Sequence, residues 1–243
     1  IGVAAIISLI TISRGLENSI QDQFESFGTN RIIISAKGFQ GPGTVSEGLT
    51  ERDVETVEKI SGIDYVVPSI FRQAEIKYNK ETAFTLVQAL PAEDYEQVSQ
   101  DLNVNLEKGS MIEENDKFSA IIGFRAAKEM FDKELKVGNK IEINKQEFKI
   151  IGIWEETGDA QTDNRVSITL EAAREIFNEP DHIDTMIVQA KSESDVPLLQ
   201  KKIEHELEQK RGDTNFQVLT AAQILEQIND ILGIIQVVLV GIA

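Results

Sequence analysis

One stretch of the sequence carries enough oxygen ligands to bind a hard cation. Residues 155–164 read Glu-Glu-Thr-Gly-Asp-Ala-Gln-Thr-Asp-Asn, and carboxylate and amide oxygens are the ligands that calcium takes in proteins. The run lacks the spacing of an EF-hand loop, and no glutamate stands at the twelfth position. We therefore interpret it as a solvated acidic loop, with a calcium site as the less favoured alternative.

The residue types that most enzymes use for catalysis are scarce. The sequence has no cysteine, which excludes thiolate nucleophiles, disulfides and cysteine-ligated metals. His182 and His205 are the only histidines, and their polar neighbours predict exposed surface residues. No serine occupies a GxSxG turn, and neither a GxxxxGK nor a GxGxxG phosphate-binding motif occurs. We therefore expect no enzymatic activity, no cofactor and no bound metal in this chain.

The charge balance excludes a further class of function. The 243 residues carry a net charge of −17, from 24 Lys and Arg against 41 Asp and Glu. A nucleic-acid partner needs a basic face that neutralises phosphates, so we expect no nucleic acid. With 41% hydrophobic residues, the chain is long enough to bury a sizeable core.

Both ends of the chain are apolar and uncharged. Residues 1–13 and 231–243 contain no charged side chain. A membrane-spanning helix needs about 20 apolar residues, so neither end suffices alone. We interpret both as parts of two transmembrane helices, and the alternative is two apolar helices packed in a soluble core. Few Lys or Arg residues lie near these ends, which favours the outer side of the membrane for everything between them.

An amphipathic stalk follows the first apolar end. Leu16, Ile20, Phe24 and Phe27 recur at spacings of 4, 4 and 3, which is typical of one apolar helix face. Gly28 then ends the pattern. We expect a helix that leaves the membrane and continues to this glycine.

A second stalk leads into the other apolar end. Thr220 is the predicted cap of a final helix, which carries Ile224 and Ile228 directly into the apolar run. We expect the apolar faces of the two stalks to pack on each other, with hinges at Gly28 and Gly233. Relative movement of the two spans would then move the domain between them.

The region between the stalks alternates strands and helices. Residues 31–70 and residues 183–219 each run strand, helix, strand, and a piece with its own hairpin separates them. This order predicts an α/β domain of two βαβ halves, with a small α/β insert near residues 100–160. The predicted strands are 31–35, 63–70, 71–78, 82–90, 119–123, 140–143, 148–154, 166–170, 183–190 and 216–219.

A glycine-rich loop interrupts the first half at residues 37–49. It holds four glycines and Pro42, which predicts a flexible loop. We consider Phe39, Gln40 and Gly41 a candidate contact surface for a partner. A loose connector is the equally favoured alternative.

Taken in order, several short blocks resemble the MacB-like periplasmic core domain of ABC transporter permeases of the FtsX/MacB/LolCDE type. The blocks are Ile1-Gly2-Val3-Ala4-Ala5-Ile6-Ile7-Ser8-Leu9, Phe27-Gly28-Thr29-Asn30, Leu49-Thr50-Glu51-Arg52-Asp53, Ala120-Ile121-Ile122-Gly123 and Phe216-Gln217-Val218-Leu219-Thr220. Each block is weak alone, and their order and spacing carry the resemblance.

The resemblance implies a Porter-type domain of two βαβ halves with a small Sabre-like insert, flanked by truncated transmembrane helices. The implied segments are 1–13 (end of transmembrane helix 1), 14–29 (stalk helix), 30–100 (first Porter half), 101–160 (insert), 161–219 (second Porter half) and 220–243 (stalk helix and start of transmembrane helix 2). It also implies a cytoplasmic ABC ATPase subunit as partner and a second permease copy, in a homo- or heterodimer. An extracytoplasmic partner or cargo is implied as well.

The function implied is transmission of ATP-driven helix movement to substrate export or extraction outside the cell membrane, with this domain extracytoplasmic. One alternative is the extracytoplasmic ligand-sensing domain of a membrane receptor, which the residues beyond Ala243 would distinguish. The other is a soluble enzyme with apolar terminal helices, for which a concave site with convergent polar groups would be needed.

Overall fold

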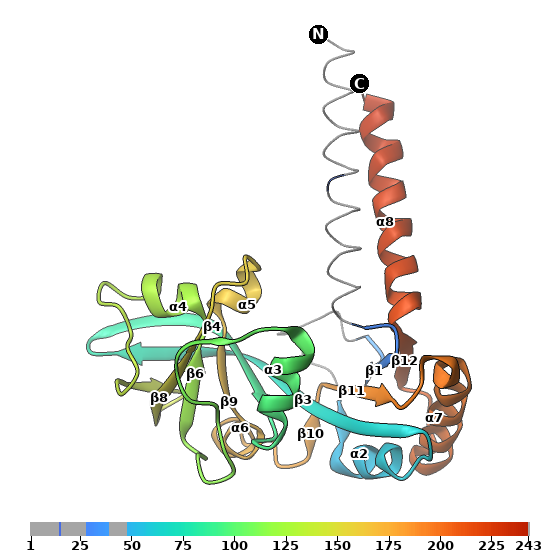
Figure 1. Cartoon of the computed structure of the whole chain (residues 1–243), viewed down its shortest axis with the longest axis horizontal. Helices are drawn as coiled ribbons and strands as arrows, with labels where there is room; N and C mark the ends of the chain where they lie inside the picture. Colours follow the sequence, from blue (N-terminus) through green and yellow to red (C-terminus); the bar gives the residue numbers. More distant parts are fainter. Residues whose placement is uncertain (1–14, 16–27, 39–47, 243) are drawn as a thin grey trace.

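The computed structural model describes Gly15 and residues 28–38 and 48–242. Within these residues, strands rich in β-branched side chains form a ten-stranded sheet, which runs through two lobes in Figure 1. Its strands are β1 (Arg31–Ala36), β3 (Ile63–Tyr78), β4 (Glu81–Leu90), β5 (Leu106–Gly109), β6 (Ser119–Ile122), β7 (Lys140–Ile143), β8 (Gln146–Trp154), β9 (Val166–Thr169), β11 (Thr185–Ala190) and β12 (Phe216–Thr220). A separate small sheet pairs β2 (Leu49–Thr50) with β10 (His182–Ile183).

Helices connect and cover these strands. They are α2 (Glu51–Glu58), α3 (Asp94–Leu102), α4 (Phe124–Glu129), α5 (Ala160–Asn164), α6 (Leu170–Phe177), the 3₁₀ turn η1 (Glu193–Asp195), α7 (Val196–Arg211) and α8 (Ala221–Ile242). Figure 1 shows α8 projecting away from the body, with the C-terminus at its far end. Among the described residues, no helix is long and apolar enough to cross a membrane.

The lobe beneath α8, called here the stalk lobe, is built from two interleaved strand–helix–strand units. The strand order is β12-β1-β11-β3, and every neighbouring pair is antiparallel. β1 and β3 are therefore parallel with β11 between them, and β11 and β12 are parallel with β1 between them. The units β1-α2-β3 and β11-α7-β12 thus share one sheet, although residues far apart in the sequence supply them.

The helices α2 and α7 cover one face of the stalk lobe. Val57 of α2 and Ile203 of α7 are fully buried in the main core cluster, together with Ile34 of β1. Each helix is amphipathic. It packs its apolar side against the sheet and keeps its polar side in solvent. An ion pair between Asp53 and Arg211, at 2.5 Å, joins the two helices.

The strand β3 links the stalk lobe to the other lobe, called here the far lobe, which holds β4 to β9 with α4 and α5 (Figure 1). The prediction of two strands, 63–70 and 71–78, was wrong, because a single strand spans both. β3 pairs with β11 as far as Ser69 and with β4 from Ile70 onward. The strand exchanges partners without a turn, since no glycine or turn dipeptide interrupts it there.

Two local predictions also need correction. The predicted turn at residues 144–147 is shorter, because Asn144 and Lys145 both have positive φ (48° and 73°) and close a two-residue hairpin loop. Residues 155–164, predicted as a loop throughout, end in the short helix α5. The Asp159 carboxylate caps this helix by accepting a hydrogen bond from the Thr162 amide at 2.7 Å.

The helix α3 covers the opposite face of the sheet, at the boundary between the lobes. Tyr95 of α3 packs in a second core cluster with Val67, Ile121 and Trp154. The Tyr95 hydroxyl donates a hydrogen bond to the carbonyl oxygen of Ile168 at 2.6 Å, so the buried phenol is satisfied. Because these side chains come from β3, β6 and β8, α3 binds both lobes together.

Candidate functional site

The start of β1 and the end of β12 lie side by side in the stalk lobe. The two strands are antiparallel neighbours, with Ile32 opposite Thr220 and Ile34 opposite Val218. The chain enters β1 from Gly28 and leaves β12 into α8, which rises beside both strands in Figure 1. We call this region, with the side chains that fix it, the stalk junction.

Asn30 and Arg31 anchor the first strand of the stalk junction. The Asn30 amide Nδ2 donates to the carbonyl oxygen of Ala190 at 3.2 Å, and the Ala190 amide donates back to the Asn30 carbonyl at 2.9 Å. Arg31 Nε donates to Gln189 Oε1 at 3.0 Å. Gly28, two residues earlier, has a φ of +89°, a left-handed conformation that favours glycine. The β1 end is therefore fixed to β11, and the chain before it turns at Gly28.

Arg31 also reaches α3. Its side chain is 7% exposed and forms an ion pair with Asp101 at 3.1 Å, and the Tyr65 hydroxyl donates to the same Asp101 oxygen. Burial, and then the neighbouring carboxylate of Asp101, raise the pKa of Tyr65 above its ordinary value. The start of β1 is thus tied to the last turn of α3, from which the chain passes into β5 of the far lobe.

A capping box fixes the second strand of the stalk junction to α8. The Gln223 amide donates to Thr220 Oγ1 at 3.2 Å, and the Thr220 amide donates to Gln223 Oε1 at 3.0 Å. Gln200 of α7 donates through Nε2 to Gln223 Oε1 at 2.9 Å and to the Val218 carbonyl at 2.8 Å. The first turn of α8 therefore has a fixed direction relative to β12 and α7.

The predicted stalk residues fall partly within the described chain. On α8, Ile224 and Ile228 are half-buried and lie on the same side as the buried Leu232, whereas Ile231 and Ile234 are 57% and 65% exposed. The predicted residues Leu16, Ile20, Phe24, Phe27, Phe39, Gln40 and Gly41 lie outside the described residues.

The two predicted hinge glycines differ in setting. Gly28 lies in a turn just before β1, whereas Gly233 lies inside α8, which is a continuous helix on both sides of it. Nothing within 4 Å would meet a Cβ atom at Gly233. Both hinges stay predictions.

An acidic cleft of about 350 Å³ lies between α2, the start of α3 and the start of α6. Burial, followed by the charges of Glu93 and Glu58, raises the pKa of Asp94 to about 6. The two cations of the cleft already have partners, since Lys117 pairs with Glu171 at 2.5 Å and Arg174 pairs with Glu51. Acidic side chains therefore outnumber basic ones in the cleft, and neither Lys117 nor Arg174 forms an ion pair with Asp94.

The histidines and the oxygen-rich run are placed as follows. The prediction that His182 is an exposed surface residue was wrong, because its side chain is 15% exposed and Nε2 lies 2.8 Å from the fully buried Asp184. His205 is exposed, as predicted.

Asp163 in the oxygen-rich run is buried and accepts hydrogen bonds from the Thr157 amide and hydroxyl at 2.9 and 2.8 Å. Within the described chain, no three His, Asp or Glu side chains group to hold a metal ion.

Sequence reasoning missed the polar part of the stalk junction. Arg31, Asp101 and Tyr65 come from three separate segments, and only the fold brings them together. One signal was available for Arg31, which is a lone charge at the start of the otherwise apolar strand 31–35. Asp101 gives no such signal because it lies among other polar residues, and Tyr65 gives none because a tyrosine is ordinary in a strand such as 63–70.

The fold and the stalk junction define a mixed α/β domain whose first and last strands are neighbours, with a long helix continuing from the last one. Residues 1–206 match the family model described as the MacB-like periplasmic core domain, and the chain belongs to that family. Its relatives include an ABC transporter permease and a macrolide export ATP-binding/permease protein.

The curated relatives include an ABC transporter permease of Methanocaldococcus jannaschii, 31% identical over 100% of this chain and 61% of its own length. The macrolide export ATP-binding/permease protein MacB of Bdellovibrio bacteriovorus is 28% identical over 100% of this chain and 40% of its own length. The chain therefore spans less than two thirds of these relatives.

Two solved structures share the fold. The periplasmic region of MacB from Actinobacillus actinomycetemcomitans superposes with a TM-score of 0.72 at 17% identity, covering 87% of this chain and 98% of that one. The extracellular domain of the transporter YknZ from Gram-positive bacteria gives a TM-score of 0.64 at 18% identity, covering 79% and 100%. The mixed α/β fold expected from the sequence is thus confirmed.

Proposed function

We propose that this chain is the extracytoplasmic domain of an ABC transporter permease subunit in the cell membrane. In this proposal it transmits ATP-driven movement of the membrane helices to substrate export or extraction outside the membrane. ATP hydrolysis would lie on a separate or fused cytoplasmic ABC ATPase. A second permease copy, in a homo- or heterodimer, would complete the transporter. Family membership and the permease relatives support the assignment to a transporter.

The observation that carries the transmission proposal is the stalk junction. Because β1 and β12 are hydrogen-bonded neighbours, with Ile32 opposite Thr220, helices leading to and from them would act on one sheet at one place. The stripe of Ile224, Ile228 and Leu232 on α8 is the surface that we propose packs on the stalk at residues 14–29. Packed helices transmit a shift because they are stiff along their axes.

We further propose that residues 30–100 and 161–219 are the two Porter-type halves, which form the stalk lobe and supply β4 and β9 to the far lobe, and that residues 101–160 are the Sabre-like insert within the far lobe. The interleaved units β1-α2-β3 and β11-α7-β12 support the first part. The second half of β3 and all of β4 extend into the far lobe, so the insert would be carried on a hairpin supplied by the first half (Figure 1).

Two connections would carry movement from the stalk junction to the far lobe. One is β3, which runs through both lobes as a single strand. The other is the ion pair between Arg31 and Asp101, which joins the start of β1 to α3. Since α3 packs on side chains of both lobes, a displacement at Arg31 would reach the far lobe through it.

Site-specific labelling tests the location. Ser194 is exposed in η1, so a Ser194→Cys variant of the full-length membrane protein, free of other cysteines, should react with a membrane-impermeant maleimide in intact cells. Ser69 is 1% exposed, and Ser69→Cys is the matched control that should stay unlabelled. Labelling of Ser194→Cys only after lysis would contradict an extracytoplasmic domain.

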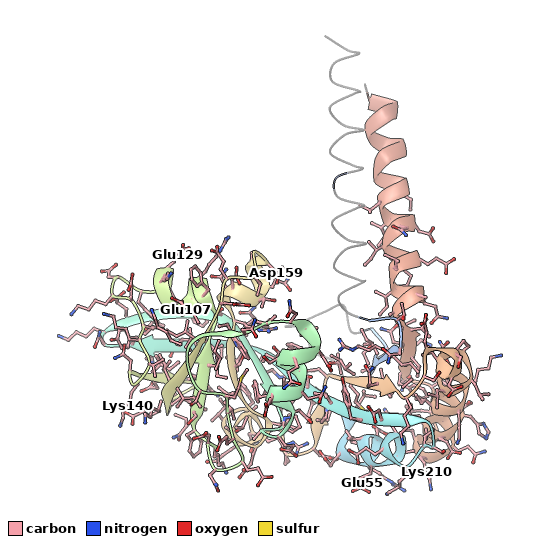
Figure 2. The ribbon with its side chains drawn as sticks, in the orientation of Figure 1. Glu55, Glu107, Glu129, Lys140, Asp159 and Lys210 are labelled. Carbon is pink, nitrogen blue, oxygen red and sulfur yellow. The ribbon has the colours of Figure 1, made fainter. Side chains whose placement is uncertain are left out.

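Distance measurements test the transmission. Figure 2 labels Glu129 and Lys140 on the far lobe, and Ile231 is exposed on α8. Spin labels at Glu129→Cys and Ile231→Cys in the full transporter should change their distance when ATP is bound and trapped. A pair at Glu129→Cys and Lys140→Cys, within the far lobe, should not change. An unchanged distance from α8 to the far lobe would contradict transmission and favour the ligand-sensing alternative.

A further inference from the structure

A small pocket lies under α3, between this helix and the strands β4, β8 and β9. Its lining includes the buried side chains of Tyr95, Trp154 and Ser167 and the half-buried Gln88, Leu102 and Arg165. The volume of the cavity is about 20 Å³. The pocket is separate from both the stalk junction and the acidic cleft.

Arg165 brings an unsatisfied positive charge to this pocket. Its Nε atom is buried and has no hydrogen-bond partner, and its guanidinium forms no ion pair with any residue in the described part of the chain. Burial lowers the pKa of Arg165 below its ordinary value. The guanidinium nevertheless stays protonated at neutral pH, because arginine is not deprotonated in proteins.

The nearest carboxylates are engaged elsewhere. Asp159 and Asp163 attract Arg165 electrostatically, but Asp159 accepts from the Thr162 amide at 2.7 Å, and Asp163 accepts from Thr157 and from the Gly158 amide at 3.1 Å. Neither carboxylate forms an ion pair with Arg165. A buried donor without a partner is rare in folded proteins, and a bound group that accepts its hydrogen would satisfy it.

A second donor faces the same space. The Ser167 hydroxyl oxygen accepts a hydrogen bond from Trp154 Nε1 at 3.3 Å, which leaves the hydroxyl hydrogen of Ser167 free to be donated. Gln88 also lines the pocket. The polar groups of the pocket therefore include the Arg165 cation and the Ser167 hydroxyl, and most of its other lining residues are apolar.

The cavity of about 20 Å³ has room for a small ion. Chloride and bromide are small monovalent anions that accept hydrogen bonds from any direction. We propose that the pocket binds a small monovalent anion, held by Arg165 Nε and Ser167 Oγ, and chloride and bromide are the probes that test it.

The sole tryptophan of the chain, Trp154, reports on this site. Bromide quenches tryptophan fluorescence on contact, so a titration of the 243-residue chain with bromide, at constant ionic strength against gluconate, should give quenching that saturates. Chloride should compete and restore the fluorescence. Quenching that rises linearly without saturation, and is indifferent to chloride, would mean that the pocket holds water only and would overturn the proposal.

Matched arginine variants identify the residue responsible. Arg165→Met should remove the saturable quenching and leave only the collisional part. Arg125→Met is the control, because Arg125 also lies near Asp163, at 3.7 Å, but does not line the pocket. It should keep the saturable quenching. Saturable quenching that persists in Arg165→Met would place the anion elsewhere and contradict the assignment.

A stability measurement keeps the proposal testable if Arg165→Met does not fold. An anion that binds only the folded protein raises the midpoint of thermal unfolding with its concentration. The unaltered chain should therefore unfold at a higher temperature in chloride than in gluconate of equal ionic strength. Equal midpoints in the two salts would contradict a bound halide.

Discussion

Asp94 carries a charge that the folded protein disfavours. Its pKa is raised from 3.8 to about 6 by burial and by Glu93 and Glu58, so between these pH values the folded chain holds a proton that the unfolded chain has lost. The carboxyl therefore destabilises the fold increasingly as pH rises from about 4 to about 6, and fully above that. Asp94→Asn should raise the free energy of unfolding at pH 7.5 by about 1–2 kcal/mol, because each pK unit corresponds to about 1.4 kcal/mol and partial exposure reduces the effect.

Urea unfolding at pH 7.5 and at pH 4 measures this gain, which should vanish at the lower pH. Glu96→Gln is the control, since it removes an equal charge from an exposed position in the same turn of α3. It should change the stability by only a few tenths of a kcal/mol. A gain for Asp94→Asn that is the same at both pH values would contradict the titration argument.

Gly109 at the end of β5 has no room for a side chain. A Cβ atom there would lie 2.0 Å from the carbonyl oxygen of Ile151 and 2.8 Å from Gly152 Cα, and the residue has a φ of +93°. Gly109→Ala should therefore lower the free energy of unfolding by about 3 kcal/mol or more, since backbone atoms must move. Gly138→Ala is matched to it, with a φ of +91° and nothing within 4 Å. It should lose only about 1–2 kcal/mol, the penalty of the left-handed conformation. Equal losses in thermal unfolding would contradict the steric argument.

At the scale of elements, the direction of α8 depends on its cap. Thr220→Ala removes the hydroxyl that accepts from the Gln223 amide, so we expect a loss of about 1 kcal/mol and faster hydrogen exchange in the first turn of α8. Thr169→Ala is the matched control, because it removes a similar cap from α6, where the Ala172 amide donates to Thr169 at 3.1 Å. It should lower the stability similarly without changing exchange in α8. Unchanged exchange at the start of α8 in Thr220→Ala would contradict the capping role.

Periodicity predicted most elements because helices and strands bury one face of a local pattern. The strand at residues 31–35, the capped helix after Thr50 and the final helix after Thr220 follow from such patterns and were confirmed. The single strand β3 was not predicted, because its continuity depends on the exchange of partners at Ser69 and Ile70. Pairing between segments more than 100 residues apart leaves no trace in local periodicity.

At the scale of the whole molecule, the candidate site was predicted only in its apolar part. The stripe that includes Ile224 and Ile228 follows from spacing, and α8 carries it on one side. The side chains that join the stalk junction to α3 could not be found this way, because Arg31 and Asp101 meet only after the sheet has formed. Likewise, the burial of Arg165 results from α3 packing over β9, which no sequence pattern specifies.

The ion pair between Arg31 and Asp101 gives the transmission proposal its sharpest test. If α3 carries movement to the far lobe, Arg31→Met and Asp101→Asn should each reduce the ATP-dependent change in distance between labels at Glu129 and Ile231. The double variant should lose no more than either single variant, because each change breaks the same connection. The loss of a buried ion pair also destabilises the fold. A thermal unfolding curve must therefore show that each variant is still folded at the temperature of the distance measurement.

A control separates transmission from a general effect of losing ion pairs. Lys77 pairs with Glu142 at 3.4 Å within the far lobe, and both side chains are more than one third exposed. Lys77→Met should therefore leave the ATP-dependent distance change intact. If the Arg31 and Asp101 variants keep the full distance change while folded, α3 does not transmit the movement, and β3 alone must carry it. If their effects add in the double variant, the two residues act through separate contacts rather than through their ion pair.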